Sequence, residues 1–306
     1  MERNLAHVCV LRDEAAELLC PALSVEHPGV IVDCTVGLGG HSKALLARSG
    51  PNSTLIGMDV DAGNLSKAKE TLREFGDRVR LFHANFSQVT DVLAETGTPA
   101  VNILLADLGI SSSQLDDSSR GLSFQVDGPL DMRLDDRLTT TAADLVNKLD
   151  EKSLADLIYQ YGEERLSRRI ARRIVDARKD HHIERTGELA GIVLRSYPPE
   201  KRSGHRRIHP ATRTFQALRI AVNDEIRALE ALLASLPTVI APGGRAGIIS
   251  FHSLEDRPVK RAFSSWVEAG TGRLVTPKPV VASAREIQAN PRSRSAKLRV
   301  IERLAA

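Results

Sequence analysis

Residues 30–41 read VIVDCTVGLGGH, a short apolar run followed by an acidic residue and a glycine-rich turn. The apolar run predicts a buried strand, and the pattern of residues 41–48 predicts a helix directly after the glycines. A strand, a glycine turn and a helix in this order are typical of a nucleotide-binding loop, where the backbone approaches a ligand closely and helix amides bind an anion. A tight strand-to-helix turn without a ligand explains these residues alone equally well.

The alternation of predicted strands and helices continues on both sides of a long interruption. Further strands are predicted at residues 54–58, 79–82, 101–106, 245–251 and 298–301, with helical patterns between the earlier ones and one long helix at 214–236. Strands that alternate with helices predict parallel β-α-β units and a doubly wound α/β sheet.

The interruption shows no strand pattern. Residues 108–136 are rich in Gly, Ser and Asp and predict an irregular loop, and the segments between 141 and 193 are helical. An irregular loop of this length is usually functional. We therefore predict a discontinuous sheet domain, residues 1–136 and 213–306, and an all-helical insertion at 137–212.

Composition restricts the class of protein. The chain has 306 residues, 42% hydrophobic and 26% charged, as expected for a globular chain with a sizeable core. No apolar run approaches the roughly 20 residues of a membrane helix, and the first ten residues do not resemble a signal peptide. Three cysteines without a C-x-x-C pair predict neither a disulfide framework nor a structural zinc site. We expect a cytoplasmic protein without a bound metal.

The net charge of +3 is unevenly distributed. Residues 163–213 hold 14 Lys and Arg against 7 acidic residues, and residues 257–306 hold 11 against 3. Two basic segments in an otherwise acidic chain indicate surfaces for a polyanion, although a solvated helix face is the commoner explanation of any single run.

Acidic residues end three of the predicted strands, at the edge where open α/β sheets bind ligands. Asp33 suits a ligand with a cationic amino group. Asp59 lies 20 residues after Gly39, the distance at which an acidic side chain binds ribose hydroxyls, although it could instead cap a helix. Asp107 precedes a Gly-Ser loop and suits a reacting centre. Because the G-x-G-x-x-G spacing of dinucleotide sites is absent, S-adenosylmethionine fits better than a dinucleotide.

At this point the chain resembles a specific family, the bacterial ribosomal RNA methyltransferases called MraW or RsmH. The matching stretches run almost from end to end, at residues 7–14, 37–42, 105–114, 120–124, 127–133, 161–165, 209–220, 249–257 and 290–292. The chain departs from the family pattern at Cys34, Leu38, Ser113 and Pro258, none of which removes a polar group discussed here.

The resemblance implies a class I (Rossmann-like) S-adenosylmethionine-dependent methyltransferase sheet with a helical substrate-recognition insertion. It implies methylation of the exocyclic N4 of a cytosine in the decoding region of 16S ribosomal RNA, within the small ribosomal subunit. It does not determine the oligomeric state, and a homodimer is one of the possible states. It places cofactor contacts on Gly39, Gly40, His41, Asp59, Phe86, Asp107 and Gln114. A core position explains Phe86 on sequence alone almost as well.

Asp107, or a backbone carbonyl just after it, is the expected acceptor for an N–H of the target amine. Methylation at cytosine C5 would instead need a cysteine nucleophile, and none follows Asp107. The expected phosphate contacts are Arg168, Arg169, Arg172, Arg173, Arg202, Arg206, Arg207, Arg213, Arg292, Arg294 and Lys297, with His205 and His209 as further RNA contacts.

Three other interpretations stay open at this stage. An RNA-binding assembly factor with the same fold would lack turnover, a nicotinamide oxidoreductase would bind NAD, and a DNA methyltransferase would share every feature except the family match.

Overall fold

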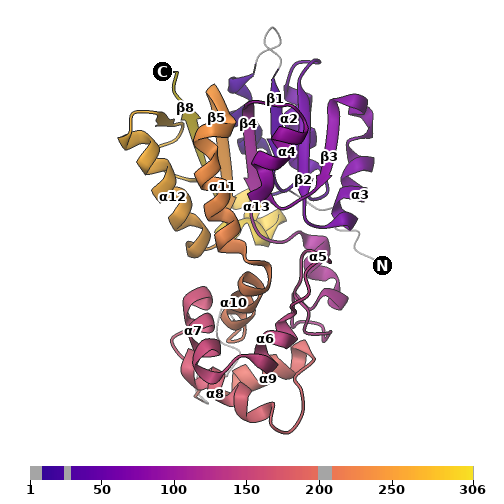
Figure 1. The fold of residues 1–306 in the computed structure, drawn as a ribbon, viewed down its shortest axis with the longest axis vertical. Coiled ribbons are helices and arrows are strands. Elements are labelled where there is room, and N and C mark those ends of the chain that lie inside the picture. The colour runs from indigo at the N-terminus through magenta and orange to yellow at the C-terminus, as the bar shows by residue number, and fades with distance from the viewer. Residues whose placement is uncertain (1–8, 24–28, 199–208, 306) are drawn as a thin grey trace. The chain divides into compact units, whose positions relative to one another are not determined.

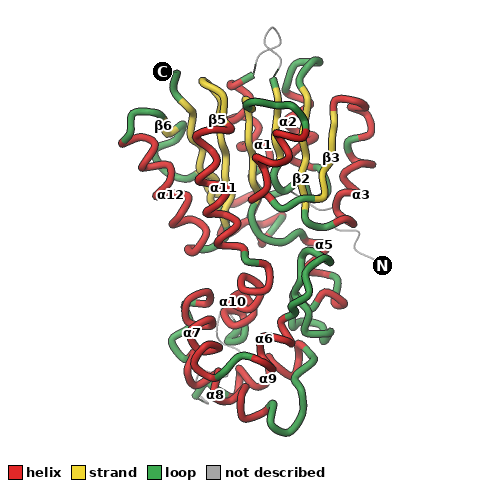
Figure 2. The backbone as a smooth tube through the Cα atoms, viewed as in Figure 1, coloured by secondary structure: helices red, strands yellow, loops and turns green. Residues whose placement is uncertain are grey.

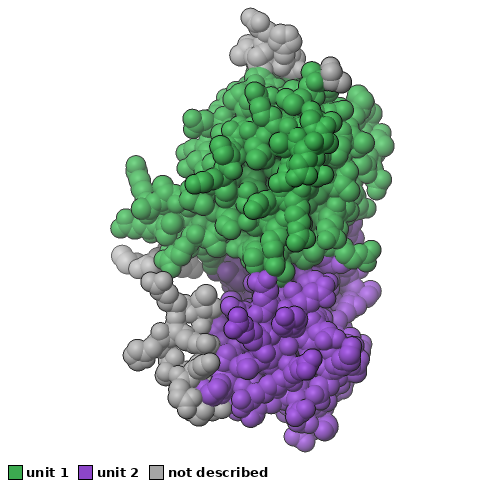
Figure 3. All heavy atoms as spheres, turned by 90° about the vertical axis from the view of Figure 1, so that its left-hand side faces the viewer, with its two compact units in different colours: residues 1–109, 226–306 green, residues 110–225 purple. Residues whose placement is uncertain are grey.

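The computed structural model describes residues 9–23, 29–198 and 209–305, which fall into two compact units (Figures 1 and 3). Unit 1 is Met1–Gly109 with Ile226–Ala306, and unit 2 is Ile110–Glu225. The predicted insertion, 137–212, lies inside unit 2. Residues 110–136 and 213–225, which the sequence pattern places with the sheet domain, belong instead to unit 2. No helix in the described ranges is long and apolar enough to cross a membrane.

Unit 1 is built on a single sheet with the strand order β3-β2-β1-β4-β5-β8-β6, and β7 also pairs with β8 (Figure 2). The strands are β1 (Val30–Asp33), β2 (Thr54–Asp59), β3 (Val79–His83), β4 (Val101–Asp107), β5 (Ile240–Ser250), β6 (Gly272–Leu274), β7 (Val280–Val281) and β8 (Lys297–Arg303). The first five are parallel, and β8 is antiparallel to its neighbours. The predicted doubly wound sheet is confirmed. Its order reverses between β1 and β4, and such a switch point is where these folds bind ligands.

Both faces of the sheet are covered by helices, which explains why its strands are almost continuously apolar. One face packs against α1 (Arg12–Leu19), α2 (Gly40–Arg48) and α3 (Ala62–Thr71). The other packs against α4 (Val89–Glu95), α11 (Glu225–Val239) and α12 (Ser253–Glu268). Successive strand residues alternate between the two cores: Ile31 belongs to the first and Val32 to the second.

Short elements complete the chain. They are α13 (Ala284–Ala289) and the 3₁₀ turns η1 (Cys20–Ala22), η2 (Arg73–Arg78), η3 (Phe86–Gln88), η4 (Ser118–Arg120) and η6 (Pro291–Ser295).

Unit 2 is helical. It contains α5 (Ser112–Asp116), α6 (Ala142–Lys148), α7 (Glu151–Gly162), α8 (Ser167–Ala177), α9 (Thr186–Arg195) and α10 (Thr212–Asn223). Its apolar interior includes Leu154, Ile158, Ile174, Val193 and Leu218, all fully buried. The predicted irregular loop therefore contains one short helix, α5.

The prediction of a single helix at 214–236 was wrong. The chain forms α10 and α11 instead, and Asp224 between them has a left-handed backbone with φ of 50°. The side chain of Asn223 explains the break, because it leaves the helix surface to bond residues 132–134. Arg219 and Glu225 close the corner with two hydrogen bonds of 2.8 Å.

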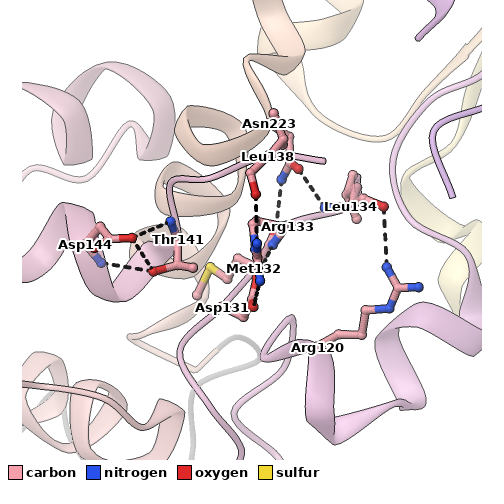
Figure 4. A network of polar contacts seen from close by, with 9 residues as sticks. All are labelled: Arg120, Asp131, Met132, Arg133, Leu134, Leu138, Thr141, Asp144 and Asn223. Atoms are coloured by element: carbon pink, nitrogen blue, oxygen red, sulfur yellow. Dashed lines mark hydrogen bonds and ion pairs between the residues drawn. The ribbon is translucent and has the colours of Figure 1, made fainter. Parts of the chain in front are cut away.

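A polar network holds residues 131–134 against the helices of unit 2 (Figure 4). Asn223 donates to the carbonyl of Met132 and accepts from the amide of Leu134, at 2.8 and 2.7 Å. Arg133 forms two bonds with Asp131 and a third with the carbonyl of Leu138. These bonds are the physical reason that the segment before residue 137 belongs to unit 2.

Candidate functional site

The glycine turn lies between β1 and α2 and depends on its glycines. Gly39 precedes the first residue of α2 with φ of 84°, and a Cβ there would stand 3.2 Å from Leu72. A Cβ at Gly40 would overlap the sulfur of Cys9. The free amides at the start of α2 are therefore reached by a backbone that only glycine permits.

Asp59 closes this turn from the neighbouring strand. Its Oδ2 accepts from the amide of Gly37 at 2.8 Å, and its Oδ1 accepts from the amide of Asp61 at 2.9 Å. Burial raises the pKa of Asp59 to about 6. The cap of α3 is Asp61, whose carboxylate accepts from Gly63 and Asn64. The helix-cap explanation of Asp59 is therefore wrong.

Asp33 and Thr35 join the ends of β1 and β4. The buried carboxyl of Asp33 accepts from the hydroxyl of Ser42 at 2.6 Å and from the amide of Thr35, and burial raises its pKa to about 6. Thr35 Oγ1 accepts from the amide of Asp107 at 2.7 Å. The polar end of β1 thus fixes the backbone that carries Asp107.

Asp107 faces His41 and keeps one oxygen without a partner. His41 Nδ1 lies 3.7 Å from Asp107 Oδ2, while Oδ1 is covered and accepts no hydrogen bond within the described chain. His41 Nε2 lies 2.9 Å from the carbonyl of Val10, so this nitrogen carries the proton. The Asp107 side chain as a whole remains 23% exposed. A ligand can therefore approach this carboxyl through its exposed part. Oδ1 accepts a hydrogen bond from no group of the described chain.

The two groups do not form an ion pair in spite of their proximity. Burial lowers the pKa of His41 to about 4. Burial also raises the pKa of Asp107 well above its usual range, and the charges of Asp33 and Glu255 raise it further. Both shifts favour the neutral forms. Carboxyls gathered in this way gain from a cation brought close to them, because it offsets their mutual repulsion.

The remaining predicted site residues are placed differently. Phe86 begins η3, directly after β3, and packs partly buried against the core, so it has a structural role while part of its surface remains exposed. Gln114 belongs to unit 2, where its Oε1 accepts from the amide of Ser111 and caps α5. The structure thus brings Gly39, Gly40, His41, Asp59 and Asp107 to one edge of the unit 1 sheet.

The sequence analysis missed two groups at this edge. Cys9 lies against Gly40, and burial, followed by the charges of Asp107 and Asp33, raises its pKa to about 11. Glu255 lies in the first turn of α12 and accepts from the amide of Phe251 at 2.7 Å. No local pattern marks either residue, because Cys9 reaches the turn only after the N-terminal segment folds over α2.

The predicted RNA contacts are dispersed. Arg168, Arg169, Arg172 and Arg173 are exposed along α8. Arg213 donates to the carbonyl of Glu163. Lys297 bonds Asp256, which indicates a structural role. Arg202, His205, Arg206 and Arg207 lie outside the described residues.

Comparison with known proteins gives a consistent result. Residues 4–304 match the model of the MraW methylase family. A ribosomal RNA small subunit methyltransferase H of Synechococcus sp. (strain CC9605) is 52% identical over 304 residues, 98% of either chain. Its namesake in Synechococcus elongatus is 49% identical, over 97% of this chain and 95% of the relative. The one in Syntrophobacter fumaroxidans is 46% identical, over 98% and 97%.

Proposed function

The chain belongs to the MraW methylase family, and from this premise we propose that it uses S-adenosylmethionine to methylate small-subunit ribosomal RNA. The target we propose is the exocyclic N4 of a cytosine in the decoding region of 16S rRNA, reached in the small ribosomal subunit in the cytoplasm. The observation that carries the proposal is the unpartnered Oδ1 of Asp107 beside a glycine turn.

The residues of unit 1 fit this cofactor. We assign Asp59, beside the turn, to the ribose hydroxyls, the α2 amides after Gly39 to the carboxylate, and Phe86 to the adenine ring. The carboxyls near Asp107 suit a cationic sulfur. When bound, S-adenosylmethionine supplies a methyl group on positively charged sulfur, which an amine attacks in line. Gln114, in α5, is a further contact that the resemblance implies.

Asp107 acts on the amine. The lone pair of a cytosine N4 is delocalised into the ring, so this nitrogen is a poor nucleophile. A hydrogen bond from N4–H to the Asp107 carboxyl favours the pyramidal, nucleophilic form and orients it. After transfer the nitrogen is positively charged, and its proton leaves to solvent or to Asp107. His41 Nδ1 faces the other carboxyl oxygen at 3.7 Å, in a ring whose tautomer is set by the carbonyl of Val10.

The protonation state of the cysteine thiols supports methylation at cytosine N4 over methylation at C5. Attack at C5 needs a thiolate to activate the ring. Burial raises the pKa of all three cysteines: Cys9 to about 11, Cys20 above its usual value, and Cys34 well above it. The thiol form therefore prevails at neutral pH, and a nitrogen acceptor needs no thiolate.

The direct test is nucleoside mass spectrometry after incubation with labelled S-adenosylmethionine. Unmethylated small subunits and naked rRNA are offered as separate substrates. We expect N4-methylcytidine. Label at another base position contradicts the assignment to N4, and absence of label from both RNAs with cofactor binding intact moves the substrate to DNA or another RNA.

Replacing Asp107 tests its role. The positive charge of bound S-adenosylmethionine favours the ionised form of Asp107, so we expect D107N to lose roughly 10- to 100-fold in turnover, the value of one hydrogen bond to a charged acceptor. Isothermal titration should show that affinity for S-adenosylhomocysteine changes by no more than about threefold. D91N, at an exposed acid of α4, is the matched control and should behave as wild type. Undiminished turnover of D107N with unchanged affinity would exclude a catalytic Asp107.

A further inference from the structure

Four arginines from two helices line one hollow on unit 2. The hollow has a volume of 610 Å³ and is lined by Arg169, Arg172, Arg173, Asp176, Ala177, Ile192 and Arg195. We propose that this hollow, here called the arginine groove, binds the phosphodiester backbone of the RNA strand that carries the target base. The inference rests on the proposed function in taking RNA as the substrate.

The sequence of α8 builds one wall of the groove. Residues 167–177 read SRRIARRIVDA, with Ile170, Ala171 and Ile174 fully buried on one face. The arginine pairs fall on the opposite face because the helix repeats every 3.6 residues. A solvated convex face would spread these charges into water. Here Arg169, Arg172 and Arg173 share a hollow with a second helix instead.

Helix α9, which packs against α8, supplies the other wall (Figure 1). Ile192 is buried and forms an apolar floor on which arginine stems can lie. Arg195 folds back along its own helix, so that its Nη1 lies 3.3 Å from where a Cβ on Gly191 would stand. The glycine leaves room for this guanidinium at the groove.

The charges of two of the four groove arginines are not paired within the described part of the chain. Arg169 and Arg173 make no ion pair or hydrogen bond with any residue in the described ranges. Arg172 makes one exposed contact of 3.4 Å with Glu151, and such pairs contribute little. Asp176, the acidic residue of the lining, is bound to Lys179 at 2.8 Å. Like charges four residues apart on a helix repel, so this arrangement costs stability unless an anion is bound.

The chemistry of the lining selects a phosphodiester backbone. Guanidinium groups match the oxygens of phosphate in pairs. The lining contains no aromatic side chain on which a base could stack, so the contact is with the backbone and independent of sequence. Several cations along one hollow fit successive phosphates of a strand better than a single small anion.

The test uses two pairs of substitutions in the full-length protein. R169Q/R173Q removes two charges from the groove, and K148Q/K152Q removes two exposed charges elsewhere on unit 2, outside the lining. Fluorescence anisotropy measures binding of a labelled 16S rRNA fragment that contains the decoding region, over a range of salt concentrations. A second titration uses pyrophosphate.

We expect R169Q/R173Q to bind the fragment roughly tenfold more weakly at 0.1 M salt, with a salt slope smaller by about 1.4, the value for two phosphate contacts on a single strand. K148Q/K152Q should stay within about twofold of wild type. The melting temperature of R169Q/R173Q should be unchanged or higher, since repulsion is relieved. A lower melting temperature would point to a structural role for these arginines and overturn the assignment.

The remaining outcomes separate the two proposals. Equal loss in both double variants would mean that general charge, not the groove, binds RNA. Pyrophosphate binding that R169Q/R173Q loses while RNA affinity is kept would make the groove a small-anion site. Wild-type RNA binding and methyl transfer in R169Q/R173Q would overturn the groove and leave the proposed function standing. If RNA binding depends on the groove but the protein never methylates rRNA, the groove would stand and the proposed function would be overturned.

Discussion

The carboxyl of Asp59 has a pKa of about 6, raised by burial, so its charge changes within the range of ordinary buffers. Ribose hydroxyls donate more strongly to the ionised form, and protonation competes with that bond. Affinity for S-adenosylhomocysteine should therefore be constant above about pH 7 and fall as the pH drops below about 6. Isothermal titration between about pH 5 and 8 measures this directly.

D59N should bind more weakly at high pH and lose most of this dependence. A smaller dependence should remain, because burial also raises the pKa of Asp33 to about 6. D61N is the matched control: Asp61 caps α3 and asparagine caps a helix about as well, so D61N should keep the stability and the pH profile of binding of wild type. A D59N profile identical to wild type would remove Asp59 from the ribose site.

At the scale of elements, the break between α10 and α11 depends on one side chain. Asn223 makes hydrogen bonds to the carbonyls of Met132 and Arg219 and to the amide of Leu134. N223A leaves these backbone groups without their partner, at a cost of about 2–3 kcal/mol. Hydrogen exchange should show faster opening of residues 127–134 and α10, with unit 1 unaffected. N52A, at an exposed asparagine in a turn of unit 1, is the control, and protection unchanged in N223A would show that packing alone makes the break.

The hydrogen bonds of Asn223 are an example of what the sequence could not predict. β1, β2 and β4 were predictable because both of their faces are buried and most of their residues are apolar. β6 and β7, three and two residues long, carry too little pattern to be found. Residues 214–236 keep a helical period across Asp224, and the bonds that break the helix come from residues about ninety positions earlier.

The site divides in the same way. Gly39, Asp59 and Asp107 were predictable, because strand ends and glycine turns follow from local sequence and meet at one edge of a parallel sheet. The approach of His41 Nδ1 to Asp107 was not, since it depends on how the N-terminal segment, through Val10, fixes the ring. Cys9 and Glu255 arrive from segments far apart in the chain for the same reason.

At the scale of the molecule, the chain leaves unit 1 after Gly109 and returns to it at Ile226. Both cores of the sheet belong wholly to unit 1, and the sheet needs no strand from the intervening residues. Unit 1 should therefore fold when residues 110–225 are replaced by a short Gly/Ser linker. A single cooperative melt with retained sheet content in circular dichroism would verify this, and an unfolded product would contradict it.

The same shortened protein also measures how much unit 2 contributes to the affinity for the cofactor. Gln114 is the one proposed cofactor contact in unit 2, and one neutral hydrogen bond is worth about 0.5–1.5 kcal/mol. Affinity for S-adenosylhomocysteine should therefore fall by no more than about tenfold, and Q114A in the full chain should match that loss. Methyl transfer to RNA should vanish, because the arginine groove is gone. A loss above about a hundredfold in a folded unit 1, with Q114A near wild type, would mean that unit 2 holds cofactor contacts other than Gln114.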